Sequence, residues 1–174
     1  MDGLDTYRKL IAKVDAQCRR SRDLLGARLH CGPGCCDCCR HIAVFAVEAV
    51  ALAAAFKELG AEQAGAVRRR AAVADSDGAC PLLDVGGRCV MYAARPVICR
   101  TQGLPLLVRE KAALRISACG RNDFSAAPIP AGAAVDLERL NLLLAAVNRL
   151  FVARNRPRCP ERITIAQALK MEIP

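Results

Sequence analysis

Apolar side chains recur at every third or fourth residue in two long segments, which is the period of an amphipathic helix. In residues 2–26, where Gly26 predicts the end of the helix, the stripe comprises Leu4, Tyr7, Ile11, Val14 and Cys18. In residues 134–154 a wider stripe comprises Leu137, Leu140, Leu144, Val147 and Phe151, with Leu143 and Leu150 beside it. The sequence therefore predicts one long helix near each end of the chain.

Shorter elements are predicted between and after these two helices. Helices at about 44–59 and 61–74 are separated by Gly60, and a last short helix at about 161–171 follows two prolines. The stretch LPLLVREKAALRIS, residues 104–117, is typical of two short strands around a charged turn, which predicts a β-hairpin.

Two cysteine-rich loops interrupt this helical plan. Residues 27–41 contain CGPGCCDCCRH, in which glycine and proline prevent a regular helix, and residues 75–103 are rich in turn signals and hold three further cysteines. The pattern predicts a mainly α fold, with a small helical domain, two cysteine-rich loops and one short β-hairpin. We expect residues 1–174 to form a single domain.

The composition predicts a fold that needs more than apolar packing. Only six of the 174 residues are aromatic and none is Trp, so the core is built from aliphatic residues and Ala, which bury little area each. No apolar run suits a signal peptide, and the longest apolar stretch, residues 41–56, contains Glu48 and is too short to span a membrane. We expect a cytoplasmic protein without membrane association, where eleven cysteines favour metal ligation or redox chemistry over disulfides.

The spacing of the cysteines indicates a metal site. The first loop reads Cys31-x3-Cys35-x2-Cys38-Cys39, and the second reads Cys80-x8-Cys89-x9-Cys99. Cysteines three or four residues apart can converge on one ion or cluster, whereas two adjacent cysteines diverge and suit two sites, or one cluster and one neighbour. Closing loops between such distant ligands costs entropy, which a centre with several metal–sulfur bonds offsets.

These two segments resemble the YkgJ-like family of zinc- or iron-chelating cysteine-cluster proteins. The resemblance rests on CGPGCCDCC at 31–39 and CPLLDVGGRCVMYAARPVICR at 80–100. The family pattern is C-x3-C-x2-CC, followed by C-P-x-L, a further Cys, and Y-x-x-R-P-x-x-C-R. The resemblance covers residues 28–120, which we interpret as the metal-binding region, with residues 1–26 and 134–172 as flanking helices.

The resemblance implies about eight metal-binding cysteines and an iron–sulfur cluster or zinc as the cofactor. The implied ligands, with Cys119 as the candidate for the eighth, are Cys31, Cys35, Cys38, Cys39, Cys80, Cys89, Cys99 and Cys119. Cys36 departs from the pattern, which has a small residue there. Irregular spacing favours iron–sulfur, whereas zinc favours paired knuckles, and Cys35-x2-Cys38 alone resembles one. No catalytic residue is implied, although members are often labelled Fe–S oxidoreductases.

Charged and imidazole side chains beside the loops each have two interpretations. Arginines next to the cysteines either lower the pKa of the thiols or are ordinary surface charges; these are Arg40, Arg95 and Arg100. His30 and His41 are alternative metal ligands. Glu48 is either an acceptor close to the site or a helix-surface charge.

Three further features are expected to lie outside the site. Cys18 falls on the apolar stripe of the first helix and is interpreted as a small core residue. Cys159, between two prolines, is interpreted as a free thiol. The run Arg68–Arg70 is interpreted as a solvated helix face.

Three functions are weighed. The first is a metal-binding protein for electron transfer or redox sensing, with an unknown redox or protein partner. The second is an accessory or catalytic component of a methylase-like protein-modifying system, because flagellin lysine methylases carry a similar cysteine region. The third, a zinc-stabilised nucleic-acid-binding module, has the support of a +9 net charge but lacks stacking aromatics and ranks last.

One further motif match and one question about helix packing arise from the sequence. The string Cys31-x3-Cys35-x2-Cys38 also matches that of radical-SAM enzymes, but the chain lacks the repeated strand–helix alternation those enzymes need. The apolar stripes of the two long helices suit packing within the chain or across a homodimer.

Overall fold

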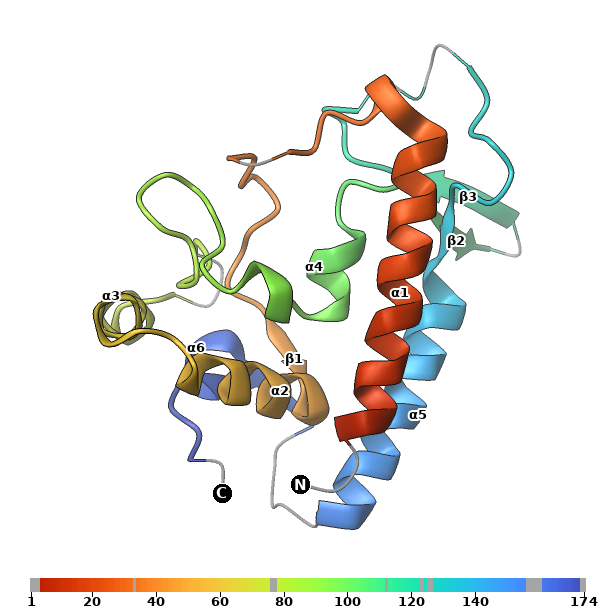
Figure 1. The fold of residues 1–174 in the computed structure, drawn as a ribbon. Coiled ribbons are helices and arrows are strands. Elements are labelled where there is room, and N and C mark those ends of the chain that lie inside the picture. Colours follow the sequence, from red (N-terminus) through yellow and green to blue (C-terminus); the bar gives the residue numbers. More distant parts are fainter. Residues whose placement is uncertain are drawn as a thin grey trace. The chain divides into compact units, whose positions relative to one another are not determined.

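Helices dominate the described part of the chain, but short strands in two small sheets make the fold mixed α/β rather than purely helical (Figure 1). The structure, a computed structural model, describes residues 4–32, 34–75, 78–111, 113–122, 124, 127–155 and 161–172. The chain divides into two compact units. Unit 1 comprises Met1–Tyr7, Pro33–Pro96 and Val147–Pro174, and unit 2 comprises Arg8–Gly32 and Val97–Ala146.

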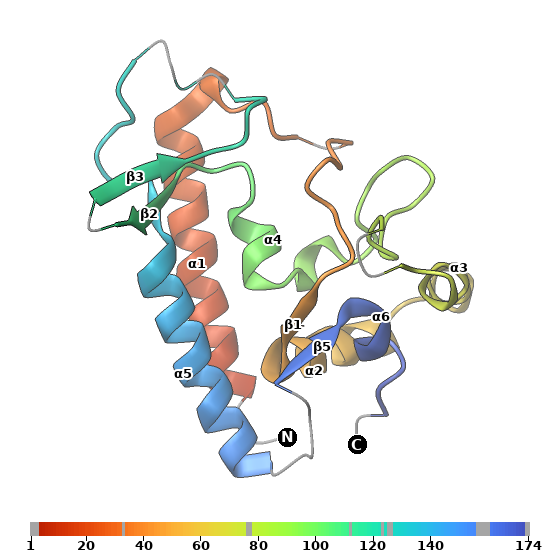
Figure 2. The same cartoon turned by 180° about the vertical axis from the view of Figure 1, so that it is seen from behind.

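Unit 1 is built around a two-stranded antiparallel sheet. Strands β1 (Ala43–Phe45) and β5 (Arg162–Thr164) pair so that Val44 lies opposite Ile163. Each strand continues directly into a helix, β1 into α2 (Ala46–Lys57) and β5 into α6 (Ile165–Ala168) (Figure 2). Helix α3 (Ala61–Ala72) completes the unit by packing against α6.

The core of unit 1 is made of small and aliphatic side chains. Helix α2 is apolar around most of its circumference and is buried, as expected for a helix enclosed by other elements. Fully buried side chains from β1, α2, α3 and α6 include Val44, Leu52, Val67 and Ile165. Leu82 and Met91, which lie within the second cysteine loop, belong to the same cluster, so the core supports that loop directly.

The sequence predicted helices from residues 44 and 161, and both begin later because the first residues pair as strands. Both strand-to-helix junctions are held by a side chain three residues into the helix. The N–H of Phe45 donates to Glu48 Oε2 (3.1 Å), and the N–H of Thr164 donates to Gln167 Oε1 (2.9 Å). Glu48 is therefore a buried helix cap rather than a surface charge.

Unit 2 contains the predicted hairpin, which the structure confirms. Strands β2 (Leu106–Glu110) and β3 (Ala113–Ser117) pair antiparallel, and β4 (Val135–Asp136) adds to β2 in parallel. The Oδ1 of Asp136 then accepts the N–H of Arg139 (2.9 Å) and caps α5 (Leu137–Asn155), the second long helix.

Both long helices are confirmed, with two corrections to their apolar faces. In α1 (Leu4–Leu25), which a 3-10 turn (Gly26–Arg28) follows, Leu10 rather than Ile11 is buried. In α5, Leu143 and Leu150 are 48% and 52% exposed, so they do not widen the buried stripe. Each precedes a buried residue by one position and points about 100° away from it.

The turn-rich segment 75–103 contains a helix that the sequence did not predict. The short α4 (Val97–Thr101) begins directly after Pro96 and carries Cys99. A 3-10 turn, Tyr92–Ala94, precedes it. Of the helices in the described ranges, none is long and apolar enough to cross a membrane.

Candidate metal centre

A short backbone ladder brings the two cysteine loops together in unit 1. Arg40 and Ala79 form an antiparallel bridge, the N–H of Cys80 donates to the carbonyl of Cys39 (3.0 Å), and the N–H of His41 donates to the carbonyl of Gly78 (2.9 Å). Main-chain hydrogen bonds therefore hold Cys39 and Cys80 side by side, although they are distant in the sequence.

A tight turn then returns the chain from Cys80 to Cys89. The N–H of Val90 donates to the carbonyl of Leu82 (2.9 Å), and the side chain of Asp84 accepts the N–H groups of Gly86 (2.9 Å) and Arg88 (2.8 Å). This hydrogen-bonded turn is a local product of its Asp and Gly residues, and it places Cys89 beside the other thiols.

Gly87 lies where the first loop meets this turn. Its φ of +71° lies in the left-handed region that favours glycine. A Cβ there would stand 3.5 Å from the sulfur of Cys36, the residue that departs from the family pattern. Cys36 therefore packs against the second loop.

The thiols of Cys38, Cys39, Cys80 and Cys89 lie close enough to affect one another's ionisation. Burial, together with the other three thiols, raises the pKa of Cys39 from 9.0 to about 12. Burial also raises the pKa of Cys80 to about 11 and the pKa of Cys89 above its ordinary value, and Cys80 and Cys89 interact as well. In this group the ionisation of one thiol makes the ionisation of its neighbours less favourable. The thiols therefore keep their protons unless a bound cation replaces them.

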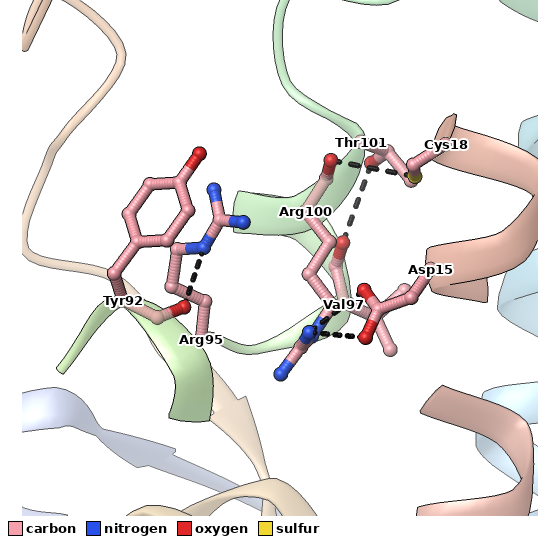
Figure 3. Close-up of polar contacts among 7 residues, drawn as sticks. All are labelled: Asp15, Cys18, Tyr92, Arg95, Val97, Arg100 and Thr101. Carbon is pink, nitrogen blue, oxygen red and sulfur yellow. Dashed lines mark hydrogen bonds and ion pairs between the residues drawn. The ribbon is translucent and has the colours of Figure 1, made fainter. Parts of the chain in front are cut away.

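Two arginines lower the pKa of neighbouring thiols and so oppose the effect of burial. The charge of Arg95 opposes the raised pKa of Cys89, which confirms one sequence interpretation. Its Nε donates to the carbonyl of Tyr92 (2.8 Å), and its guanidinium lies 3.3 Å from the centre of the Tyr92 ring (Figure 3).

Arg70 is the second such arginine, and its assignment to a solvated helix face was wrong. The side chain is half-buried, its Nε donates to the carbonyl of Pro81 (2.9 Å), and its charge opposes the raised pKa of Cys80. Nothing in the sequence singled it out from Arg68 and Arg69, because the target is a backbone carbonyl that only the fold brings within reach.

Cys31, Cys99 and Cys119 belong to unit 2. The side chain of Asn122 donates to the sulfur of Cys31 (3.7 Å), and its backbone N–H donates to the carbonyl of Cys119 (3.0 Å). The two cysteines are thus held by one asparagine that the sequence did not indicate.

Cys99 lies on α4 beside Arg100, whose contacts reach α1. The side chain of Arg100 is 7% exposed, and its Nη1 lies 2.8 Å from both carboxylate oxygens of Asp15 (Figure 3). The backbone carbonyl of Arg100 accepts a hydrogen bond from the thiol of Cys18 (3.5 Å). These contacts attach α4 to α1. Arg100 is therefore a buried ion-pair partner rather than a surface charge, and Cys18 is the buried core residue that was predicted.

His41 uses both ring nitrogens in the fold. The N–H of Ala166 can only donate, so Nε2 accepts from it (3.2 Å), and Nδ1 then donates to the carbonyl of Asp75 (2.8 Å). This tautomer joins the first loop to α6 and leaves no ring nitrogen for a metal. His30 is exposed, and its backbone N–H donates to Asn122 Oδ1 (2.8 Å).

The predicted ligands are divided between the two units. Unit 1 contains Cys35, Cys38, Cys39, Cys80 and Cys89, and unit 2 contains Cys31, Cys99 and Cys119. Within the ranges that the structure describes, no three Cys, His, Asp or Glu side chains already have the arrangement of a metal site. Cys159 lies outside the described residues.

The thiol-rich loops define a cysteine-rich metal-binding protein. A family model described as "Putative zinc- or iron-chelating domain", CxxCxxCC, matches residues 30–120, more than half of the chain, and the chain belongs to this family. Zinc or an iron–sulfur cluster fits a family of this kind. The family name spells two residues between its first two cysteines, whereas this chain has three. No curated protein and no solved structure matches the chain.

Proposed function

We propose that the chain binds its metal through a four-thiolate centre in unit 1, formed by Cys38, Cys39, Cys80 and Cys89. The observation that carries this proposal is the main-chain pairing of the two loops, in which the N–H of Cys80 donates to the carbonyl of Cys39 (3.0 Å). Burial and the nearby thiols of Cys38, Cys80 and Cys89 raise the pKa of Cys39 there. Four ionised sulfurs repel one another in a half-buried site, and a bound cation offsets that repulsion. Zinc and iron–sulfur clusters are the centres that take four thiolates.

The backbone ladder supports the same assignment. It pairs Cys39 with Cys80, and an antiparallel bridge between Leu83 and Cys89 returns the second loop to Cys89. Cys35 is a further ligand candidate from the first loop. In unit 2, Cys31, Cys99 and Cys119 are proposed as ligands of a second centre.

We favour an iron–sulfur cluster with a role in electron transfer or redox sensing. Iron–sulfur clusters accept irregular cysteine spacing, and the gaps in both loops are irregular. Zinc in the same place would be structural, because four thiolates leave no open coordination position.

Metal analysis of anaerobically purified protein tests the proposal. We expect iron and acid-labile sulfide, with a broad absorption at about 400 nm. Cys38→Ser should lose metal and lower stability, whereas the control Cys18→Ser, which changes a buried thiol outside both loops, should keep the metal. Zinc alone in the same preparation would overturn the iron–sulfur choice, and full metal content in Cys38→Ser would overturn the ligand assignment.

A further inference from the structure

Asn122 makes an unusual set of contacts for a loop residue. It is 8% exposed, and its side-chain oxygen accepts the backbone N–H of His30 (2.8 Å). Its side-chain nitrogen donates to the carbonyl of Gly103 and to the sulfur of Cys31 (3.7 Å). Both ends of the amide are therefore occupied, and one of its acceptors is a predicted metal ligand.

Gly103, which has no side chain, leaves room for the same sulfur. Its φ is +83°, and a Cβ built on it would overlap the sulfur of Cys31. The sulfur therefore lies against bare backbone, next to the amide of Asn122. Because any side chain at position 103 would displace Cys31, the glycine and the asparagine together define one position for this thiol.

A hydrogen-bond donor directed at sulfur has a chemical consequence. An N–H group stabilises the thiolate more than the neutral thiol, because the hydrogen bond to a charged acceptor is the stronger one. The thiolate is the form that binds metal. Residues that orient metal ligands in this way commonly change metal affinity by 10- to 100-fold when they are replaced.

We propose that Asn122 is a positioning residue of the metal site in unit 2, which holds the sulfur of Cys31 against Gly103. The inference rests on the proposed function, in which Cys31 is a ligand. A merely structural asparagine would join the segments at His30, Gly103 and Cys119 without affecting the chemistry of the sulfur.

Two substitutions of Asn122 separate these roles. Asn122→Asp keeps the acceptor for His30 but replaces the donor with a negative charge. Asn122→Leu fills nearly the same space without a donor. Asn148→Asp is the matched control, because Asn148 is 6% exposed and its Oδ1 accepts the N–H of Val47 (3.1 Å) in unit 1.

The first measurement uses the metal-free full-length chain. The alkylation rate of Cys31 by iodoacetamide is followed by mass spectrometry, with fragment ions locating the modified cysteine and circular dichroism confirming the fold. We expect about fivefold faster alkylation of Cys31 in Asn122→Leu, since its sulfur is no longer held in the narrow space beside Gly103. Asn148→Asp should match the wild type. Unchanged or slower alkylation of Cys31 in Asn122→Leu would overturn the proposal.

The second measurement is zinc affinity, determined by competition with a chromophoric chelator. We expect Asn122→Asp to weaken zinc binding about tenfold. Cys31→Ser is the reference: if it binds zinc like the wild type, Cys31 is no ligand and that part of the proposed function fails. If Cys31→Ser is weakened and both Asn122 variants bind zinc like the wild type, the positioning role alone is wrong.

Discussion

At the scale of single residues, burial in the fold makes three thiols of unit 1 weaker acids, namely Cys39, Cys80 and Cys89. Cys39 and Cys80 have pKa values raised to about 12 and about 11, with burial as the largest cause. At neutral pH such thiols are protonated, so a metal ion must displace protons in order to bind. The cost of ionising the group is therefore part of the metal affinity.

Zinc binding should accordingly release protons and strengthen as the pH rises. At neutral pH we expect roughly one proton per bound thiolate, about four for the unit 1 centre. Calorimetric titration of the metal-free protein in two buffers with different ionisation enthalpies measures this number. Cys39→Ser should release about one proton fewer, and zinc binding without proton release would contradict the raised pKa values.

The same raised pKa values should make the metal-free chain less stable as the pH rises, whereas zinc binding becomes stronger. Folded Cys39 and Cys80 hold their protons more firmly than in the unfolded chain, so their contribution is complete below their ordinary pKa of 9.0. It is lost as the pH rises from 9.0 toward 11 and 12. Urea unfolding across this range should show a smaller loss in Cys39→Ser than in the wild type.

At the scale of elements, the site depends on how the second loop is anchored to α3. Arg70 is the anchor, through its hydrogen bond to Pro81 and its charge near Cys80. Arg70→Ala should lower the free energy of unfolding by about 1 kcal/mol, the net contribution of one such hydrogen bond. It should also weaken zinc binding, because the pKa of Cys80 rises further.

Arg69→Ala is the matched control for this prediction. Arg69 precedes Arg70 on the same helix and is exposed, so its removal changes the net charge by the same amount. We expect unfolding in urea and zinc affinity close to the wild type. Equal effects of the two substitutions would indicate a general charge effect rather than an anchor.

Among the elements, the long periodic helices and the hairpin were predictable, whereas the shortest elements were not. The strands β1 and β5 have three residues each, and each was read as the start of the helix that follows. Their pairing depends on a partner more than a hundred residues away. Helix α4 was hidden in a turn-rich segment, and it is held to α1 by the pair Arg100–Asp15.

At the scale of the whole molecule, metal binding should contribute to folding. Unit 1 has a core of small side chains, and its two loops are joined by only a few backbone hydrogen bonds. If zinc binds only the folded chain, a free zinc concentration of about a hundred times the Kd should raise the free energy of unfolding by about 2.7 kcal/mol. Thermal unfolding with zinc and with excess chelator measures this difference. Cys38→Ser should respond much less, and a wild type that unfolds at the same temperature in both conditions would contradict the prediction.

The sequence alone determined the two long helices, the hairpin and the identity of the candidate ligands, because periodicity and cysteine spacing are local properties of the chain. The tertiary structure decided which thiols share a neighbourhood, since Cys39 meets Cys80 through main-chain hydrogen bonds that any residues can form. It also decided the contacts of Arg70, His41 and Asn122, whose partners are backbone groups or sulfur atoms of distant segments. Such partners leave no pattern in the sequence, because a backbone carbonyl is the same at every position.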